Sequence, residues 1–221
     1  MPRSQGTAER PQLSRDRVLR AAVAVADGGG LGGLTIRSLA TQLDVKPMSV
    51  YHYVANKSEI LDGIVDLVFG EIELPVAGGD WRVEITRRAR SAREVLRRHP
   101  WAIALMESRT SPGPATLRHH DANLGTFRAA GFSVPMTAHA YALLDAFVYG
   151  FAVQEAGLPF EGSEDAAEVA GGMMEQFGSG QYPHLTELAV DHVLQPGYAF
   201  GDEFDFGLDL ILDGLARSRP S

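Results

Sequence analysis

The chain contains no cysteine among its 221 residues. This absence excludes a disulfide framework, a thiolate metal site and a cysteine nucleophile, and it suits a reducing cytosol. Residues 1–15 lack the apolar core that a signal peptide needs, so we expect no export. The longest apolar run, Met136 to Val153, is interrupted by His139 and Asp145, which predicts a buried helix rather than a membrane span. We therefore expect a cytoplasmic protein that does not enter a membrane.

Common catalytic and metal-binding patterns are also missing. The sequence has no G-x-S-x-G motif, and no two of its seven histidines stand three or four residues apart, as ligands on one helix face would. His119 and His120 are adjacent, so on a helix they point about 100° apart and do not predict a metal site. We expect no metal and no cofactor. Scattered carboxylates leave an all-helical enzyme as a remote alternative.

One glycine-rich segment matches a cofactor motif by its letters alone. The residues GGGLGG, at 28–33, fit G-x-G-x-x-G. A dinucleotide site needs a strand before this motif and an acidic residue about 20 residues after it. Here an alanine-rich helical pattern precedes the glycines, and Tyr53 stands where the acid would be. We interpret the segment as a helix stop followed by a loop.

The net charge of −8 argues against nucleic acid as a partner, but the charge is unevenly distributed. Residues 1–60 hold eight basic and five acidic side chains, a balance of +3, whereas the remaining 161 residues hold 12 basic and 23 acidic ones, a balance of −11. A basic end on an acidic body is typical of a protein in which one segment meets phosphate. We expect residues 1–13, with two prolines and few large apolar groups, to form a disordered arm.

Two short helical patterns flank a tight break between Thr35 and Lys57. Thr35 can cap the first helix, whose apolar residues share one face: Ile36, Leu39, Ala40 and Leu43. The second helix opens with Pro47, which is tolerated in a first turn because that N–H has no helical partner. Only Val50 and Val54 of this helix are predicted to face inward. The arrangement indicates a helix-turn-helix.

The other residues of the second helix are too many and too large for so small a core, so several must point outward: Met48, Ser49, Tyr51, His52 and Tyr53. A helix fits the major groove, where its first turn reaches base edges while hydroxyl groups bond phosphates. The following residues, NKSE at 56–59, resemble a capping box that places Lys57 at a helix amino terminus, which is suited to an anion. We predict double-stranded DNA as the partner. The alternative is that YHYV is a core aromatic cluster.

The segment LTIRSLATQLDVKPMSVYHYVANKSEILDGIVD resembles the DNA-binding module of the TetR family of transcriptional regulators. That family's pattern is LT-x-R-x-LA-x-x-L-x-V, then Y-x-[HYF]-[VF], N-K and L-L-D, and nearly every position is matched here. The resemblance implies residues that face bases, namely Arg37, Lys46, Pro47, Met48 and His52. It also implies residues that hold phosphates, namely Thr35, Ser49, Tyr51, Tyr53 and Lys57.

The segment from Leu74 to Asp80 interrupts the helical pattern and is the predicted domain boundary. We expect a DNA-binding domain at 14–73, including a connecting helix, and a larger ligand-binding and dimerisation domain at 80–221. Asp80 can cap the next helix, which carries seven arginines between positions 82 and 98. These arginines are spread over the whole polar side of that helix, so we interpret them as a solvated face.

Two strongly apolar helices are predicted in the second domain, one at Met136–Gly157 and one at 202–217. Two such helices from each of two chains can build a four-helix interface, so we predict a homodimer. The candidate interface residues are Leu144, Val148, Leu208, Ile211, Leu212 and Leu215. The ending F-x-F-G-L-x-L-I-L-x-G-L resembles that of the tetracycline repressors within the family.

The glycine-, proline- and tyrosine-rich loops of the second domain can gate a pocket for a small-molecule effector. The candidate lining residues are Trp101, Met106, Phe127, His139, Leu143, Phe147 and Phe151. By rough alignment, the two histidines that tetracycline repressors use for drug and magnesium fall near Glu73 and Leu105, and only Glu155 stands near the acidic ligand. We therefore expect a different effector.

These observations together predict an all-α, ligand-responsive, sequence-specific DNA-binding regulator that is not an enzyme. We expect it to be a repressor that its effector releases from a pseudo-palindromic operator. The alternative in the same class is an architectural DNA-binding protein without an effector.

Overall fold

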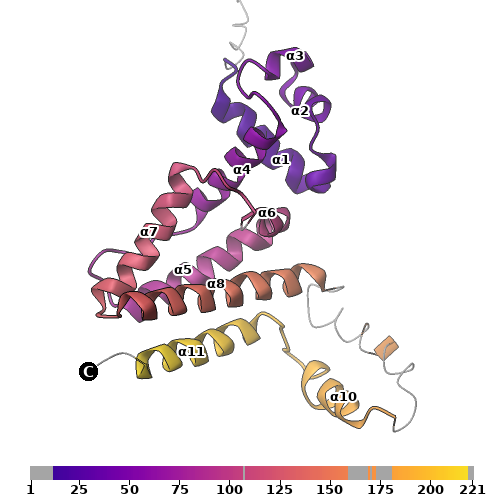
Figure 1. The fold of residues 1–221 in the computed structure, drawn as a ribbon. Helices are drawn as coiled ribbons and strands as arrows, with labels where there is room; N and C mark the ends of the chain where they lie inside the picture. Colours follow the sequence, from indigo (N-terminus) through magenta and orange to yellow (C-terminus); the bar gives the residue numbers. More distant parts are fainter. Residues whose placement is uncertain (1–11, 107, 159–168, 170, 173–180, 219–221) are drawn as a thin grey trace, which may run out of the picture. The chain divides into compact units, whose positions relative to one another are not determined.

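The computed structural model describes residues 12–106, 108–158, 169, 171–172 and 181–218. Every regular element in these residues is a helix, as predicted (Figure 1). The helices are α1 (Arg15–Gly33), α2 (Ile36–Leu43), α3 (Pro47–Val50), α4 (Lys57–Glu71), α5 (Trp81–Arg98), α6 (Ile103–Met106), α7 (Pro114–Ala129), α8 (Val134–Gly157), α10 (Pro183–Leu188) and α11 (Asp202–Arg217). A 3-10 turn, Pro100–Ala102, precedes α6, and a π-helical stretch, Ala189–Val193, follows α10. Most of the predicted arm at 1–13 lies outside the described residues.

The chain forms two compact units. The first contains residues 1–71 and 104–117, and the second contains residues 72–103 and 118–221. Their first division falls close to the boundary predicted at 74–80. The sequence pattern gives no sign that 104–117 joins the first unit, because that segment follows α5 in the chain.

Helices α1, α2 and α4 enclose the core of the first unit. The predicted inward residues Leu39, Val50 and Val54 are all buried, and so is Val18 of α1. Helices α1 and α4 pack closely at Gly63, where a Cβ atom would come within 2.6 Å of the side chain of Leu19. The inward face that the 3.6-residue period predicts for these helices is therefore the face that is buried in the structure.

The glycine segment at 28–33 differs from the prediction of a stop and a loop. Helical turns continue to Gly33, and the break is confined to Gly30, which has φ 64° and ψ −178°. Only glycine adopts this conformation without steric cost, so the kink requires this residue. The chain leaves α1 at Leu34, which is buried and anchors the entry to α2.

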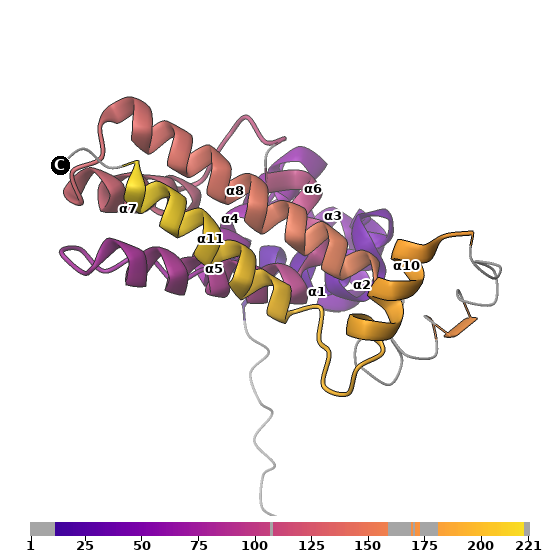
Figure 2. The same ribbon diagram turned by 90° about the horizontal axis from the view of Figure 1, so that it is seen from below.

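Helices α5, α8 and α11 form the centre of the second unit. Figure 2 shows α11 beside α8, and the same neighbours are seen in Figure 1. Gly207 of α11 allows this approach, because a Cβ atom there would lie 2.8 Å from the ring of Phe147 on α8. The length and composition of α8 would suffice for a membrane span, but its Asp145 is buried in an ion pair with Arg88 of α5. We therefore interpret α8 as a core helix.

The arginines of α5 are not simply a solvated face. Arg82 pairs with Asp209 and Asp213 of α11, and Arg90 pairs with Asp205 of the same helix. These acidic residues recur every four positions, so they form a ladder along one side of α11. The ladder holds α5 against α11 through ion pairs that the sequence pattern of either helix alone does not reveal.

Arg93 makes a more enclosed contact than the ladder arginines. Its guanidinium donates to both carboxylate oxygens of Glu155, at 3.0 and 2.5 Å, and to the carbonyl oxygen of Gly201 at 3.1 Å. It also lies 5.1 Å from the ring centroid of Phe151 and 5.0 Å from that of Phe204. Arg93 thus joins α5, α8 and the start of α11 at one point.

Candidate DNA-reading surface and effector site

The start of α2 is held by a reciprocal cap. The Thr35 hydroxyl oxygen accepts from the Ser38 N–H at 3.0 Å, and the Ser38 hydroxyl oxygen accepts from the Thr35 N–H at 2.9 Å. The helix ends at Asp44, whose φ of 54° turns the chain sharply. Thr35 is therefore a cap, as predicted, and its hydroxyl is engaged within the chain.

Helix α3 is short and presents its large side chains to solvent. Lys46 precedes its first turn, and Pro47 occupies the first helical position. Met48 is 71% exposed and Tyr51 is 45% exposed, which are unusual values for apolar and aromatic groups. Among the residues assigned to bases or phosphates by resemblance, the exposed ones are Thr35, Arg37, Lys46, Pro47, Met48, Tyr51, His52 and Lys57, and the half-buried ones are Ser49 and Tyr53.

The amino terminus of α4 carries the predicted cap in a modified form. The Asn56 side-chain oxygen accepts from the Glu59 N–H at 2.9 Å, but the Glu59 carboxylate accepts from the Ala55 N–H, at 2.7 Å, rather than from that of Asn56. This backbone bond and Arg15, which pairs with Glu59 at 3.2 Å, lower the pKa of the Glu59 carboxyl group. Exposed Lys57 therefore begins a helix whose first turn is fixed to α1.

Two contacts that the sequence pattern does not reveal join α4 to residues 109–116, the segment that leads into α7. Arg109 donates to Asp62 at 2.6 Å and to the Ser58 hydroxyl at 2.6 Å. Asp66 accepts from both the N–H and the hydroxyl of Thr116, at 2.8 and 2.9 Å. Two carboxylates on one face of α4 thus hold residues 109–116 within the first unit.

The predicted pocket residues do not gather around one cavity. Phe147 and Phe151 contact Phe204 in an aromatic cluster between α8 and α11. Phe127 instead contacts Trp81 and Phe132, Trp101 packs near His99, His139 and Leu143 are exposed, and buried Met106 belongs to the other unit. The candidates on α8 are spaced by four residues, which advances 40° beyond each full turn, so the stripe drifts from the exposed side to the buried side.

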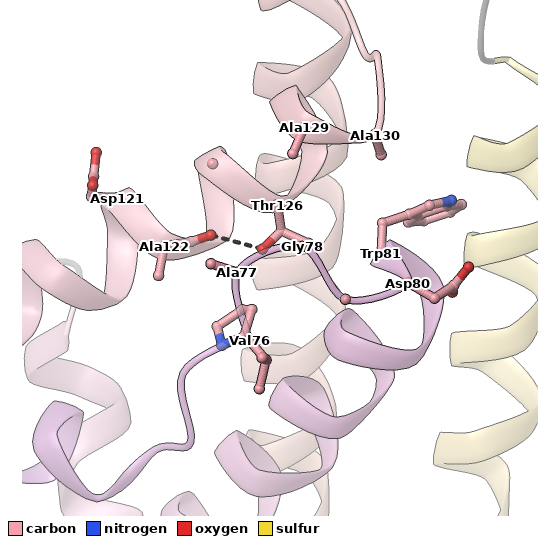
Figure 3. Close-up of a pocket in the computed structure, with 13 residues that line it drawn as sticks. Val76, Ala77, Gly78, Asp80, Trp81, Asp121, Ala122, Thr126, Ala129 and Ala130 are labelled. Atoms are coloured by element: carbon pink, nitrogen blue, oxygen red, sulfur yellow. Dashed lines mark hydrogen bonds between the residues drawn. The ribbon is translucent and has the colours of Figure 1, made fainter.

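The structure has a hollow of about 470 Å³ in a different place, between the loop before α5 and one face of α7 (Figure 3). Its lining includes Trp81 and small residues such as Ala122, Gly125 and Ala129. Figure 3 shows Asp121 pointing away from the loop, and Asp80 is occupied as the cap of α5. The hollow shares no residue with the predicted pocket.

A buried polar cluster lies between α5, α7 and α8, and we call its four residues the core polar cluster. They are Arg88, His119, Asn123 and Asp145, none more than 6% exposed. The Arg88 guanidinium donates to the Asp145 carboxylate at 2.9 Å and to Nε2 of His119 at 2.7 Å. The Asn123 amide donates to the His119 carbonyl oxygen at 2.9 Å.

The sequence does not reveal this cluster, because the large apolar residues of α7 do not mark its buried face. Leu117 and Leu124 are exposed, at 56% and 37%. The buried stripe instead runs through Thr116, His119, Asn123 and Phe127. The available signal was the lone aspartate in the apolar sequence of α8, because a buried carboxylate requires a basic partner.

Ionisation in this part of the core is strongly perturbed. Burial, followed by the charge of Arg88, lowers the pKa of His119 to about 3, so its imidazole is neutral at neutral pH. Since Nε2 accepts from Arg88, the neutral ring carries its proton on Nδ1. Burial and the negative charge of Asp145 raise the pKa of Tyr141, which also contacts Nδ1 of His120. The cluster therefore holds one cation and one anion, with the other members neutral.

The acidic side chains at the positions aligned with the tetracycline and magnesium ligands pair with arginines of α5. Glu73 pairs with Arg87, and both carboxylate oxygens of Glu155 are held by Arg93. Among the described residues, no group of three or more histidine, aspartate or glutamate side chains could hold a metal ion. Glu155 thus has a structural partner.

The predicted interface residues are placed mainly in the core of the chain itself. Five are buried, namely Leu144, Val148, Leu208, Leu212 and Leu215, and Ile211 is half-buried. The large apolar residues that α8 and α11 leave well exposed near the centre of each helix are Leu143, Val153, Phe206 and Leu210, between 48% and 65%.

Comparison with known proteins agrees with the geometry. The model of the tetracyclin repressor-like C-terminal domain matches residues 74–219. The HTH-type transcriptional repressor DrrR1 of Streptomyces coeruleorubidus is 36% identical, with 93% of this chain and 78% of the relative covered. The class A tetracycline repressor of Escherichia coli is 31% identical, with 94% and 93% covered. The structure of Streptomyces coelicolor ActR in complex with actinorhodin superposes with a TM-score of 0.75 at 26% identity, covering 95% of this chain and all of that one.

The family match spans well over half of the chain, and the helix-turn-helix occupies the part that precedes it. Full-length relatives at more than 30% identity are repressors. This chain belongs to the TetR family and is a ligand-responsive, helix-turn-helix transcriptional regulator.

Proposed function

We propose that the protein represses transcription by holding a pseudo-palindromic operator with α3 and the first turns of α2 and α4. The observation that carries this proposal is the exposure of Met48 in α3 and of Tyr51 directly after it. The neighbouring helices α2 and α4 each begin with a capping hydrogen bond, which fixes their first turns. Arg37, Lys46 and His52 supply donors for base edges, and Met48 supplies an apolar group for a thymine methyl. Lys57 and the tyrosine hydroxyls hold phosphates.

The DNA-reading unit of one chain covers only half of such an operator. We propose that two chains pair through the exposed apolar residues of α8 and α11, namely Leu143, Val153, Phe206 and Leu210. A two-fold dimer places two recognition helices about 34–36 Å apart, one turn of DNA. The dimer acts in the cytoplasm, where the operator lies.

The effector, in this proposal, binds at the core polar cluster. A small organic effector agrees with the relative that was crystallised with actinorhodin. Burying Arg88 and Asp145 costs free energy that an apolar core would avoid, and functional sites are where such costs are retained. The cluster is closed in this conformation, so the bundle opens for the effector to enter.

Helix α7 gives a route from the effector to the DNA. Its first residues, up to Leu117, belong to the first unit, and the rest belongs to the second. Thr116 is bonded to Asp66 of α4, and His119, three residues further on, is part of the core polar cluster. A ligand that moves His119 therefore moves Thr116, and with it α4. To release DNA, the effector must bind the shifted form more tightly than the DNA-competent form.

Selection of bound fragments from the source genome, followed by footprinting, tests the proposal. We expect two protected half-sites about one turn apart, and an altered consensus for Lys46→Ala, whose side chain is assigned to base edges. Thr41→Ala, which changes an exposed residue of α2 outside the assigned set, is the matched control. Broad protection without a consensus would instead identify an architectural DNA-binding protein.

A further inference from the structure

The core polar cluster has an unequal supply of donors and acceptors. Arg88 has one carboxylate oxygen and the His119 imidazole as its acceptors. Within the described residues, three enclosed oxygens lack a hydrogen-bond partner: Oδ2 of Asp145 and Oδ1 of Asn123 in the cluster, and Oγ1 of Thr137, two turns before Asp145 on α8. Two of the three, the carboxylate oxygen of Asp145 and the amide oxygen of Asn123, can only accept a hydrogen bond. The Asn123 amide nitrogen, at the other end of the same group, donates to the His119 carbonyl.

Such oxygens are rare in folded proteins, since nearly all buried polar atoms are paired. Two in one cluster, with a third on the same helix as Asp145, indicate a partner that supplies hydrogen-bond donors. A carboxylate is excluded as that partner, because it would bring a second anion against Asp145 and offer no donor. The Arg88 guanidinium already forms an ion pair with Asp145, so it does not require an acidic ligand.

The spacing of these oxygens limits the size of the partner. Thr137 and Asp145 are eight residues apart on α8, which separates them by about 12 Å along the helix axis. Tyr141 lies between them on the same stripe, and Phe127 follows Asn123 by one turn on α7. Aromatic side chains beside the acceptors favour a flat apolar body with donors at its edges.

We propose that the effector is an uncharged, hydroxyl-bearing aromatic molecule, whose hydroxyl groups donate to Asp145, Asn123 and Thr137, and that acidic molecules of the same shape are rejected. This inference rests on the proposed function, because it concerns the effector of the same regulator. It adds to that function the chemical class of the ligand that the cluster binds.

Three matched probes test the selection by calorimetry with the full chain: 2,6-dihydroxynaphthalene, 2,6-dimethoxynaphthalene and naphthalene-2,6-dicarboxylate. They share a ring system and differ in whether the edge groups donate, only accept, or carry charge. We expect the diol to bind at least about tenfold more tightly than the other two. The reason is that the other two probes each lose one or two hydrogen bonds, and this loss weakens affinity by about that factor. Equal or tighter binding of the dicarboxylate, or no binding of the diol at millimolar concentration, overturns the inference.

Two variants separate ligand recognition from folding. Thr137→Val keeps the shape and removes an oxygen without a protein partner, so we expect it to leave the melting temperature unchanged or raised, while diol affinity falls several-fold. Gln154→Ala, on an exposed position of the same helix, should change neither. If Thr137→Val keeps full diol affinity, or a crystal structure shows the diol elsewhere with water on these oxygens, the inference is wrong. Failure of the proposed function is a separate result, namely loss of specific DNA binding by the wild-type chain.

Discussion

Lowering the pH from 7 to 5 should destabilise the folded chain through His119. The imidazole is fully buried, and its pKa is lowered from 6.5 to about 3 by burial and by Arg88. The unfolded chain therefore binds a proton below pH 6.5 that the folded chain refuses. Stability from this residue is fully present above pH 6.5 and is lost progressively as the pH falls toward 3.

The magnitude follows from the two pKa values. Between pH 7 and pH 5 the protonation of the unfolded chain alone contributes about 2 kcal/mol, because the folded chain stays unprotonated over that window. Urea unfolding at fixed protein concentration measures this quantity, since dimerisation makes stability depend on concentration.

His119→Gln is the informative variant, because glutamine can still accept from Arg88 but does not titrate. We expect the difference in unfolding free energy between wild type and His119→Gln to shrink by about 2 kcal/mol from pH 7 to pH 5. His139→Gln, at an exposed position, should show no such change relative to wild type. A difference that stays constant across the window would refute the buried, neutral state of His119.

Three further outcomes are expected. Lys57→Ala should weaken binding to operator and random DNA alike and reduce the slope of log K against log salt by about 0.9, the value for one phosphate contact, in anisotropy titrations. Leu210→Glu should shift the protein to monomer in sedimentation analysis while its melting temperature at low concentration, where the wild-type chain is also monomeric, changes little, whereas a dimer that persists would place the interface elsewhere. Arg93→Met should cost about 2 kcal/mol, because it leaves Glu155 part-buried and unpaired, whereas Arg82→Met, whose partners are exposed, should cost less than about 1 kcal/mol. Equal losses in urea unfolding would contradict this ranking.

The helix-turn-helix could be predicted because its determinants are local. A cap at Thr35, a single apolar stripe on α2 and a proline at the start of α3 act within a few residues of the chain. Each has a sequence pattern that does not depend on distant contacts. The bounds of α5 and α11 were likewise set by local signals, Asp80 before one and a sustained apolar period in the other.

The interior of the second unit could not be predicted in the same way, because its polar contacts join residues far apart in sequence. Arg88 is one of seven arginines on α5, and nothing in that helix distinguishes it. Its burial depends on Asp145, 57 residues later, and on His119 of a third helix. Helix α8 posed the opposite problem, since apolar residues occupy most of its faces and the period cannot show which of them α11 covers.

The close packing at Gly113 predicts the phenotype of mutations at its codon. A Cβ atom at this position would collide with the carboxylate of Asp66, the group that holds Thr116. Any larger residue must displace that carboxylate and so break the bonds between α4 and the start of α7 without touching a DNA-facing side chain or the core polar cluster. Alleles at this codon should therefore keep their target genes repressed in the presence of the effector, yet encode a protein that keeps its recognition helix and its effector affinity.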